Sequence, residues 1–284
     1  MEARVLINSA GTETVSGLHG AVPWWSFTKT VLAIAALRLV EDGRLALHEP
    51  LPGRPYTLAQ LLRHEAGLPD YGALSAYHDD VAAGAEPWPL TRVLVETEAT
   101  RLRYPPGQGW AYSNIGYREV ADLVAAAGGL PLGEALRTLV FVPAGVTTAR
   151  LAVTPEDLSD VEMGEAKGYH PGWVYHGLVV GTTLDAARLL RALVTGRLLK
   201  PETFETMLER RALPEHRSAL HADPAYALGL MLRATDPLDH PLGHTGGGPG
   251  SSFAAYAKGG RVVAIWADAA SGLDATTEAF KGLG

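Results

Sequence analysis

Apolar and polar residues alternate along residues 3–18, on either side of the turn signal Ala10-Gly11, and this period of two predicts a β-hairpin. The next segment, residues 23–45, is apolar on nearly every side of a helix that stops at Gly43. A helix that is apolar all round lies in a protein core. We therefore predict a hairpin followed by one buried helix.

The middle of the chain shows helical patterns between segments rich in proline and glycine. The predicted helices are "TLAQLLRHEAG" capped by Thr57, "SNIGYREVADLVAAAGG" ending at Gly128-Gly129, residues 131–140 before Pro143, "GTTLDAARLLRALVTG" with a capping box of Thr182 and Asp185, and "PETFETMLERR" from Pro201. After Ala222 the period of two returns in "YALGLMLRA", "PLGHTGG" and "GSSFAAYAKGGRVVAIWADA", where Lys258-Gly259-Gly260 marks a hairpin turn, and "LDATTEAFKG" is a last helix.

This order of elements predicts an α+β architecture, in which an antiparallel sheet is flanked by helices and carries an inserted helical lobe. Residues 1–48 and 200–284 would form the α/β sheet lobe, and residues 49–199 would form a mainly helical lobe. A chain of 284 residues fits one large domain or two lobes that share a core.

Composition excludes several classes of protein. A net charge of −7 provides no basic surface for nucleic acid, and the absence of cysteine excludes disulfides, thiolate metal sites and a cysteine nucleophile. No apolar run reaches the length that spans a membrane. The start "MEARVLINSAGTET" has no basic residues followed by an apolar stretch, so no signal peptide is visible, which favours a cytoplasmic location.

Ser26 and Lys29 lie one helical turn apart at the start of the buried helix. A serine hydroxyl is a poor nucleophile without a base, and a partly desolvated lysine has the lowered pKa that lets it act as that base. The free N–H groups of a helix N-terminus also favour a nearby oxyanion. The alternative is that Ser26 caps the helix and Lys29 reaches toward the surface.

The segment "GWAYSNIGY" contains Tyr112 and Asn114, and the chain has only one other asparagine, Asn8. In an extended segment, residues two apart point to the same side. A phenol beside an ammonium ionises more easily and can transfer a proton, and the amide can donate to a substrate carbonyl. The alternative is a helix start, with Asn114 as the N-cap and Tyr112 in the core.

The segment "LGHTGGGPGSS" places His244, Thr245 and Gly246 in a strand that leads into a run of glycines. Glycines let a substrate approach an edge strand closely. The N–H of Gly247 would then lie opposite the N–H of Ser26 as a second oxyanion donor. The alternative is a hairpin turn with an incidental histidine.

The motifs Ser-x-x-Lys, Tyr-Ser-Asn and His-Thr-Gly follow one another at residues 26–29, 112–114 and 244–246. In this order they resemble the three motifs of the penicillin-recognising serine hydrolases, in the branch of the class C β-lactamases, D-Ala-D-Ala carboxypeptidases and family VIII esterases. The segments "LLRHEAGLPDY", "YPPGQGWAYSNIGY", "FVPAG" and "GLVVGTTLDAARLL" are similar to that family over most of the chain. The resemblance implies a β-lactamase/transpeptidase-like fold.

The resemblance also implies roles for the motif residues. Ser26 would be the nucleophile that forms an acyl-enzyme. Lys29 would be its base or would adjust the acidity of Tyr112. Tyr112 would shuttle the proton to the leaving group and activate the deacylating water. His244 and Thr245 would meet a substrate carboxylate or the leaving side, and Asn114 would hold Lys29 and the acyl amide. The candidate substrate-binding residues are Asn114, His244, Thr245, Gly246, Gly247 and Trp173. Trp173, Tyr175 and Trp110 are candidate pocket walls, with core packing as the alternative for each.

Two departures from the family bear on the substrate. Class C β-lactamases carry lysine where His244 stands, and histidine is mostly neutral at pH 7, so the attraction for a β-lactam carboxylate is weakened. Only 25 residues precede Ser26, which is a shorter lead than the family commonly has. We expect hydrolysis of small esters or of D-amino-acid peptide or amide bonds, with weak β-lactamase activity at most. The alternatives are a β-lactamase proper and a non-catalytic homologue that only binds ligands.

We expect neither a metal ion nor a cofactor. Pro241 and Gly243 interrupt the helix that would bring His240 and His244 together on a metal. The remaining histidines are expected on the surface or in the core, with a structural role for His64. The expected partner is a small-molecule ester, peptide or β-lactam substrate, with no nucleic acid and no membrane, and the sequence leaves the oligomeric state open.

Overall fold

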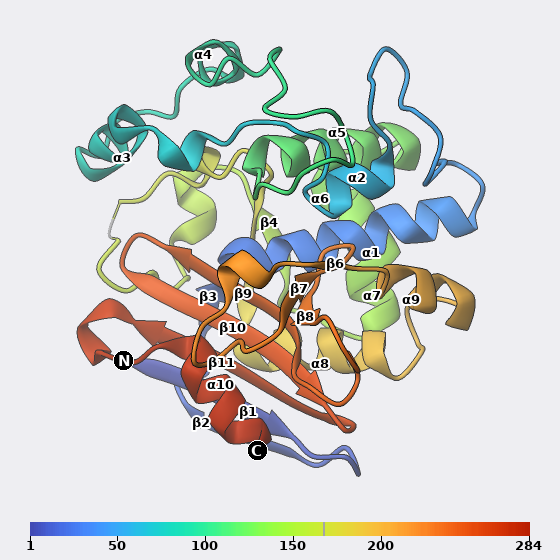
Figure 1. Cartoon of the computed structure of the whole chain (residues 1–284). Coiled ribbons are helices and arrows are strands. Elements are labelled where there is room, and N and C mark those ends of the chain that lie inside the picture. Colours follow the sequence, from blue (N-terminus) through green and yellow to red (C-terminus); the bar gives the residue numbers. More distant parts are fainter. Residues whose placement is uncertain (167) are drawn as a thin grey trace.

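The computed structural model describes residues 1–166 and 168–284. The helices are α1 (Thr28–Glu41), α2 (Leu58–Leu62), α3 (Ser75–Ala82), α4 (Leu90–Glu96), α5 (Asn114–Gly128), α6 (Leu132–Leu136), α7 (Val142–Ala144), α8 (Thr183–Val194), α9 (Pro201–Met207) and α10 (Ala275–Leu283). The strands are β1 (Glu2–Ile7), β2 (Glu13–Gly17), β3 (Ala21–Pro23), β4 (Arg150–Ala152), β5 (Leu178–Thr182), β6 (Arg211–Ala212), β7 (Pro224–Tyr226), β8 (Met231–Arg233), β9 (Leu242–Gly248), β10 (Ser251–Lys258) and β11 (Arg261–Asp268). Figure 1 shows the blue α1 running between the main sheet and a layer of helices that contains α2 and α5.

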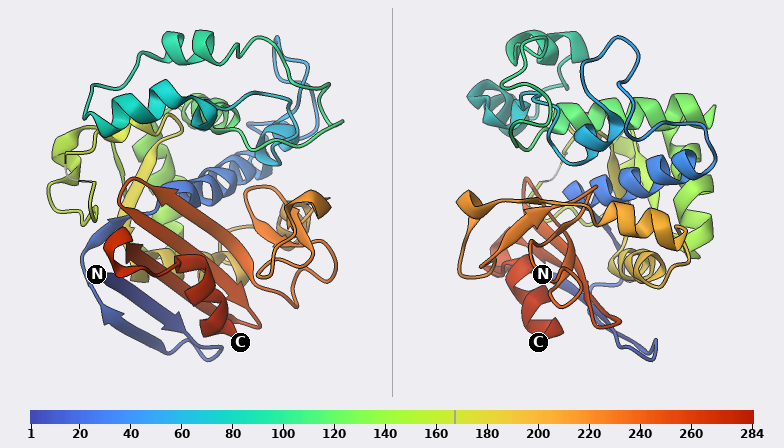
Figure 2. Two further views of the ribbon diagram at one scale, coloured as in Figure 1. Left: turned by 60° about the vertical axis from the view of Figure 1, so that its left-hand side comes forward. Right: turned by 45° about the vertical axis from the view of Figure 1, so that its right-hand side comes forward.

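The main sheet has eight antiparallel strands in the order β2-β1-β11-β10-β9-β8-β7-β6. Its first two strands are the predicted hairpin, and both chain ends lie on this sheet side of the molecule (Figure 2). The predicted turn at Gly259-Gly260 joins β10 to β11. The predicted α+β fold, an antiparallel sheet with helices, is therefore confirmed.

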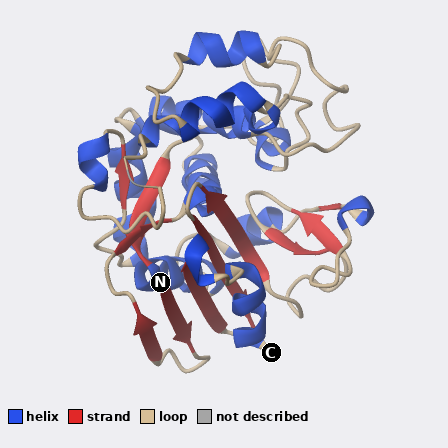
Figure 3. Cartoon of the chain, turned by 90° about the vertical axis from the view of Figure 1, so that its left-hand side faces the viewer, coloured by secondary structure: helices blue, strands red, loops and turns tan. Residues whose placement is uncertain are grey.

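Strands β10 and β11 are buried on both faces, which explains why their sequence is apolar almost without interruption. Tyr256 and Ile265 pack against α10, whereas the adjacent Ala257 and Trp266 belong to the main core. Successive side chains of a strand point to opposite faces, so two covers are needed. Helix α10, which lies beside the label C in Figure 3, is one cover, and α8 contacts the same strands as part of the other.

Helix α1 lies in the centre of the molecule, as its all-round apolar pattern predicts. Nearly all of its side chains are buried, including that of Lys29. It contacts α5 and α6 on one side and α9 on another, and the turn before it, η1 (Trp25–Phe27), packs against β9. The residues at its N-terminal end are therefore held between the sheet and the helical layer.

A second, three-stranded sheet with the order β3-β5-β4 was not predicted. Its strands are short, and β5 runs directly into α8, so its apolar residues merge with the helical pattern that follows. Helix α8 falls in the segment 49–199 that we assigned to the helical lobe, yet it packs on β1, β10 and β11. The sequence boundary at residue 199 therefore does not separate sheet-packed elements from the helical layer.

Two local predictions were wrong in detail. The helix predicted for residues 131–140 continues past Pro143, because a wider π turn at Arg137–Phe141 joins α6 to α7. Pro143 is tolerated there because it stands in the first turn of α7, where its missing N–H is not needed. The segment "YALGLMLRA" forms two strands, β7 and β8, because Gly229 turns the chain at φ +80° and leaves no room for a side chain against Ala33 of α1.

Among the described residues, no single helix has both the length and the apolar character needed to cross a membrane. Helix α5 taken together with Leu132–Ala144, which is bent from it by 77°, meets those two criteria by length and composition alone.

Candidate active site

Ser26 lies in the 3-10 turn η1, two residues before α1 begins at Thr28, and it is not the helix cap. The preceding residue, Trp25, has a left-handed backbone with φ +44°, which is a strained conformation for a large side chain. The Trp25 indole holds this turn by donating to the hydroxyl of Ser251 on β10 at 3.0 Å. The nucleophile candidate therefore sits on a sharp, anchored turn.

Strand β9 passes directly beside this turn because its residues are glycines. A side chain at Gly246 would come within 2.7 Å of the backbone nitrogen of Ser26, and one at Gly248 would enter the Trp25 ring. Gly247 points the other way and lines the cavity described below. This is the proximity that an oxyanion hole made by the N–H groups of Ser26 and Gly247 requires, and that role stays a prediction.

Lys29 is fully buried and has three polar neighbours. Its Nζ lies 3.2 Å from Ser26 Oγ, 2.7 Å from Asn114 Oδ1 and 3.2 Å from His176 Nε2. Burial lowers the pKa of Lys29 to about 7, and the nearby Asp70 carboxylate opposes part of this fall. A lysine with this pKa can take up or release a proton at neutral pH.

Asp70 fixes the orientation of Asn114. Its carboxylate accepts from the Asn114 backbone N–H at 2.8 Å and from the side-chain Nδ2 at 3.2 Å. A carboxylate only accepts, so Nδ2 must point to Asp70 and Oδ1 must point to Lys29. The helix cap of α5 is Ser113, which accepts from Gly116, and the alternative of Asn114 as the cap was wrong.

Tyr112 lies beside the lysine, whose Nζ is 4.8 Å from the centre of the phenol ring. We expected the ammonium to make this phenol easier to ionise. Burial instead raises the pKa of Tyr112, and a hydrogen bond with Ser26 opposes only part of the rise. Tyr112 is therefore a neutral hydroxyl at pH 7, which can donate a proton but is a poor resident base.

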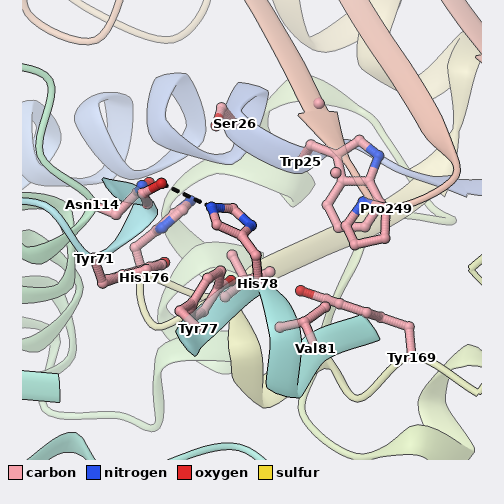
Figure 4. Close-up of a pocket in the computed structure, with 14 residues that line it drawn as sticks. Trp25, Ser26, Tyr71, Tyr77, His78, Val81, Asn114, Tyr169, His176 and Pro249 are labelled. Carbon is pink, nitrogen blue, oxygen red and sulfur yellow. Dashed lines mark hydrogen bonds between the residues drawn. The ribbon is translucent and has the colours of Figure 1, made fainter. Parts of the chain in front are cut away.

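A cavity of about 360 Å³ opens in front of Ser26. Its wall is largely aromatic, and Figure 4 shows these side chains around the end of α1. The side chains that shape it include Trp25, Tyr71, Tyr77, His78, Tyr169 and His176. No lysine or arginine is found among the described residues that line it.

The structure does not bring His244 to the cavity. Its ring is fully buried, Nδ1 donates to the carbonyl oxygen of Thr245, and Nε2 accepts from the Tyr226 hydroxyl at 2.9 Å. Burial, reinforced by the charge of Lys29, lowers the pKa of His244 to about 3, so the ring is neutral at physiological pH. Thr245 points to the opposite face, where its hydroxyl meets Thr276 of α10. Neither side chain is placed to meet a substrate carboxylate.

We therefore expect no role for His244 in the pH dependence of substrate binding. Its protonated fraction is negligible between pH 6 and 8, because the pKa lies near 3. The change in KM of a carboxylate-bearing ester over this range should be the same for the wild type and for His244→Gln, measured by steady-state kinetics. A pH-dependent KM that disappears in the variant would restore the carboxylate role.

Two of the three aromatic residues that we predicted as pocket walls, Trp173 and Tyr175, lie just behind the wall. Trp173 is almost fully buried, packs on Tyr77 with ring centres 5.3 Å apart, and donates to the carbonyl of Ala85. Tyr175 donates to the carbonyl of Trp88. Their alternate neighbours, Val174 and His176, line the cavity instead. Trp110 is not among the lining residues and packs against His64 and His216.

His64 supports the site from behind. It is buried with a left-handed backbone at φ +60°, and its Nδ1 accepts from the Ser113 N–H at 3.1 Å. Its ring centre lies 4.3 Å from that of Tyr112. The strained residue thus fixes the segment that carries Tyr112 and Asn114. In the part of the chain that is described, no group of three or more His, Cys, Asp or Glu side chains could hold a metal ion.

Sequence reasoning missed two residues at this site. Asp70 belongs to the segment "LLRHEAGLPDY" that carried the resemblance. The segment was recognised, but the role of Asp70 in orienting Asn114 was not predicted. His176 was grouped with the scattered histidines, although it directly precedes "GLVVGTTLDAARLL". A polar residue at the edge of a buried apolar strand is the signal that could have identified it.

A serine nucleophile candidate in contact with a buried lysine, on a fold of an antiparallel sheet and a helical layer, defines the class of lysine-assisted serine hydrolases. The chain belongs to the beta-lactamase family, whose pattern matches residues 19–281. The resemblance seen in the three motifs is thereby confirmed.

Relatives of this chain carry several names. It is 25% identical to Penicillin-binding protein 4* of Bacillus subtilis over 80% of this chain and 55% of that protein. It is 29% identical to lovastatin esterase of Penicillium rubens over 75% of this chain and 65% of that protein. The chain thus spans less than two thirds of the length of either. The solved structure of a D-stereospecific amidohydrolase from Streptomyces sp. has a TM-score of 0.79 at 21% identity, over 94% of this chain and 88% of that chain, which shows a shared fold.

Proposed function

We propose that this protein hydrolyses small esters, or the amide bonds of D-amino-acid-type substrates, through an acyl-enzyme on Ser26. The observation that carries the proposal is the 3.2 Å contact between Ser26 Oγ and a buried Lys29 whose pKa is about 7. At neutral pH a large share of Lys29 is uncharged, and its lone pair can accept the serine proton.

The reaction then proceeds in two halves. The Ser26 oxygen attacks the substrate carbonyl while its proton passes to Lys29, and a new C–O bond forms as the carbonyl oxygen becomes an oxyanion. Collapse of the tetrahedral intermediate breaks the bond to the leaving group, which takes a proton from the neutral Tyr112 hydroxyl as Lys29 returns its proton to Tyr112. Water repeats these steps on the acyl-enzyme and releases the acid and free Ser26.

The cavity supports uncharged substrates. Its described lining holds aromatic rings and no lysine or arginine, and His244 is buried and neutral. A substrate carboxylate would lose its water without gaining an ion pair. One relative is named as an esterase, which agrees with this preference. We therefore favour carboxylate-free esters and amides over D-Ala-D-Ala peptides and β-lactams.

A panel of substrates tests the proposal. We expect turnover of short p-nitrophenyl esters and of a D-amino-acid amide, with kcat/KM for a D-Ala-D-Ala peptide and a chromogenic cephalosporin lower by about 10- to 100-fold, which is the value of one charged hydrogen bond. A fluorophosphonate should leave one adduct, on the peptide that contains Ser26. Fastest turnover of the cephalosporin would identify a β-lactamase, and the absence of an adduct with any acyl probe would identify a non-catalytic homologue.

A further inference from the structure

His176 is a buried histidine at the active site that the three motifs do not include. It precedes β5 by two residues, only 3% of it is exposed, and it lines the cavity beside Asn114 (Figure 4). Its Nε2 lies 3.2 Å from Lys29 Nζ. Its other ring nitrogen, Nδ1, is buried without a hydrogen-bond partner among the described residues. A buried polar atom left unpaired is costly, so the placement of this ring needs a reason.

The contacts of Lys29 supply that reason. An uncharged amine has two N–H donors and one lone pair. Asn114 Oδ1, which Asp70 holds in place, is an acceptor only and takes a hydrogen bond from one of the two N–H groups. If His176 Nε2 accepts the second, the lone pair has one direction left, toward the Ser26 hydroxyl.

Resting on the proposed function, we propose that His176 is a positioning residue that accepts a hydrogen bond from Lys29 and thereby directs the lysine lone pair at Ser26. The ring must then carry its proton on Nδ1, the atom that has no partner. The same three neighbours also satisfy the charged lysine, because an ammonium has three donors for Ser26 Oγ, Asn114 Oδ1 and His176 Nε2. The proton can therefore move between Ser26 and Lys29 without any change of partner.

A histidine suits this position because it accepts without adding a charge. Burial, followed by the charge of Lys29, holds the pKa of His176 well below its usual value, so the ring stays neutral. A carboxylate in its place would stabilise the ammonium and raise the pKa of Lys29. The other titratable groups that face this pair are Asp70, Tyr112, Tyr117, His64 and His244. Of these, only Asp70 has an acidic side chain, and its carboxylate is already bound to Asn114.

Three variants test the role, with turnover of a short p-nitrophenyl ester as the readout. His176→Phe keeps a ring but has no acceptor, whereas His176→Gln can place an amide oxygen where Nε2 lies. We expect kcat of His176→Phe to fall by about 10- to 100-fold with little change in KM, because the lone pair is no longer oriented. His176→Gln should recover most of that loss. His176→Asn is the matched control, since its shorter amide does not reach Lys29, and it should behave like His176→Phe.

The pH profile separates positioning from packing. The charged form of Lys29 is less stable when it loses a hydrogen-bond acceptor, so the pKa of Lys29 should fall in His176→Phe. The acidic limb of the pH profile of kcat/KM should then move to lower pH in His176→Phe and return to its wild-type position in His176→Gln. Equal losses in all three variants with an unmoved limb, or a wild-type kcat in His176→Phe, would overturn the inference. Thermal unfolding shows which variants are folded, and if His176→Phe is not, the comparison of His176→Gln with His176→Asn decides. Labelling of wild-type Ser26 by a fluorophosphonate keeps the two proposals apart, because its absence contradicts the proposed function itself.

Discussion

Replacement of Ser26 by alanine is expected to lower kcat for a p-nitrophenyl ester by about 10⁴- to 10⁶-fold, the range seen when a nucleophile acting with its base is removed. The acyl-enzyme needs the Oγ atom that lies 3.2 Å from Lys29, and no other serine in the described part of the chain shares that contact. Substrate binding should change little, because the cavity wall is left intact. Initial rates and intact-protein mass after exposure to a fluorophosphonate measure both effects.

Ser16→Ala is a suitable control, since Ser16 is exposed on β2 at the far edge of the main sheet. It should keep wild-type kinetics and a full adduct. Undiminished hydrolysis by Ser26→Ala, or an adduct on a different peptide, would contradict the assignment of Ser26.

Replacement of Lys29 by methionine should reduce kcat by at least about 10⁴-fold, because Lys29 is the base that contacts Ser26 Oγ, at 3.2 Å. The pKa of Lys29 is about 7, burial raises that of Tyr112, and His176 is held neutral with a pKa well below its usual value. Methionine has a similar length and no charge, so the buried position of α1 can accept it. Single-turnover acylation of Ser26 measures the effect directly, and residual acylation at the wild-type rate would rule out Lys29 as the base.

Lys29 should also give stability a characteristic pH dependence. Its pKa is about 7 in the folded chain and 10.5 in its unperturbed state, so between these values the unfolded state binds more protons. The free energy of unfolding therefore rises with pH in this window, by about 2 kcal/mol between pH 7 and 9. Urea unfolding at pH 7, 8 and 9 should show this rise in the wild type relative to Lys29→Met. Parallel pH dependences in the two proteins would mean that Lys29 is not desolvated.

The sequence predicted the parts of the site that local pattern determines. Ser26 and Lys29 are one turn apart on any helix, and Tyr112 and Asn114 are two residues apart, so each pair could be recognised from local spacing. That the two pairs meet was predicted only from the resemblance of the ordered motifs to a known family. The fold followed from the same motifs and from the two apolar segments on either side of the turn at Gly259-Gly260, which form β10 and β11.

What the sequence could not predict depends on burial and on contacts between distant segments. The pKa of Tyr112 was expected to fall, because its charged neighbour was visible in the sequence but its desolvation was not. His176 and Asp70 meet the motif residues only through the tertiary fold. The prediction that Thr245 would face the substrate failed for a simpler reason. Successive residues of β9 point to opposite sides, so Thr245 and His244 could not both have faced the substrate.

The complete burial of His244 constrains which substitutions this protein could accept during evolution. A single substitution to lysine, the residue that class C β-lactamases carry there, would place an ammonium in a fully buried site against the Tyr226 hydroxyl. A desolvated ammonium without an anion loses its proton or destabilises the fold. A lysine at position 244 alone would therefore not present a cation to a substrate carboxylate in the cavity. An evolutionary path toward penicillin hydrolysis through this strand thus needs more than a point mutation at position 244.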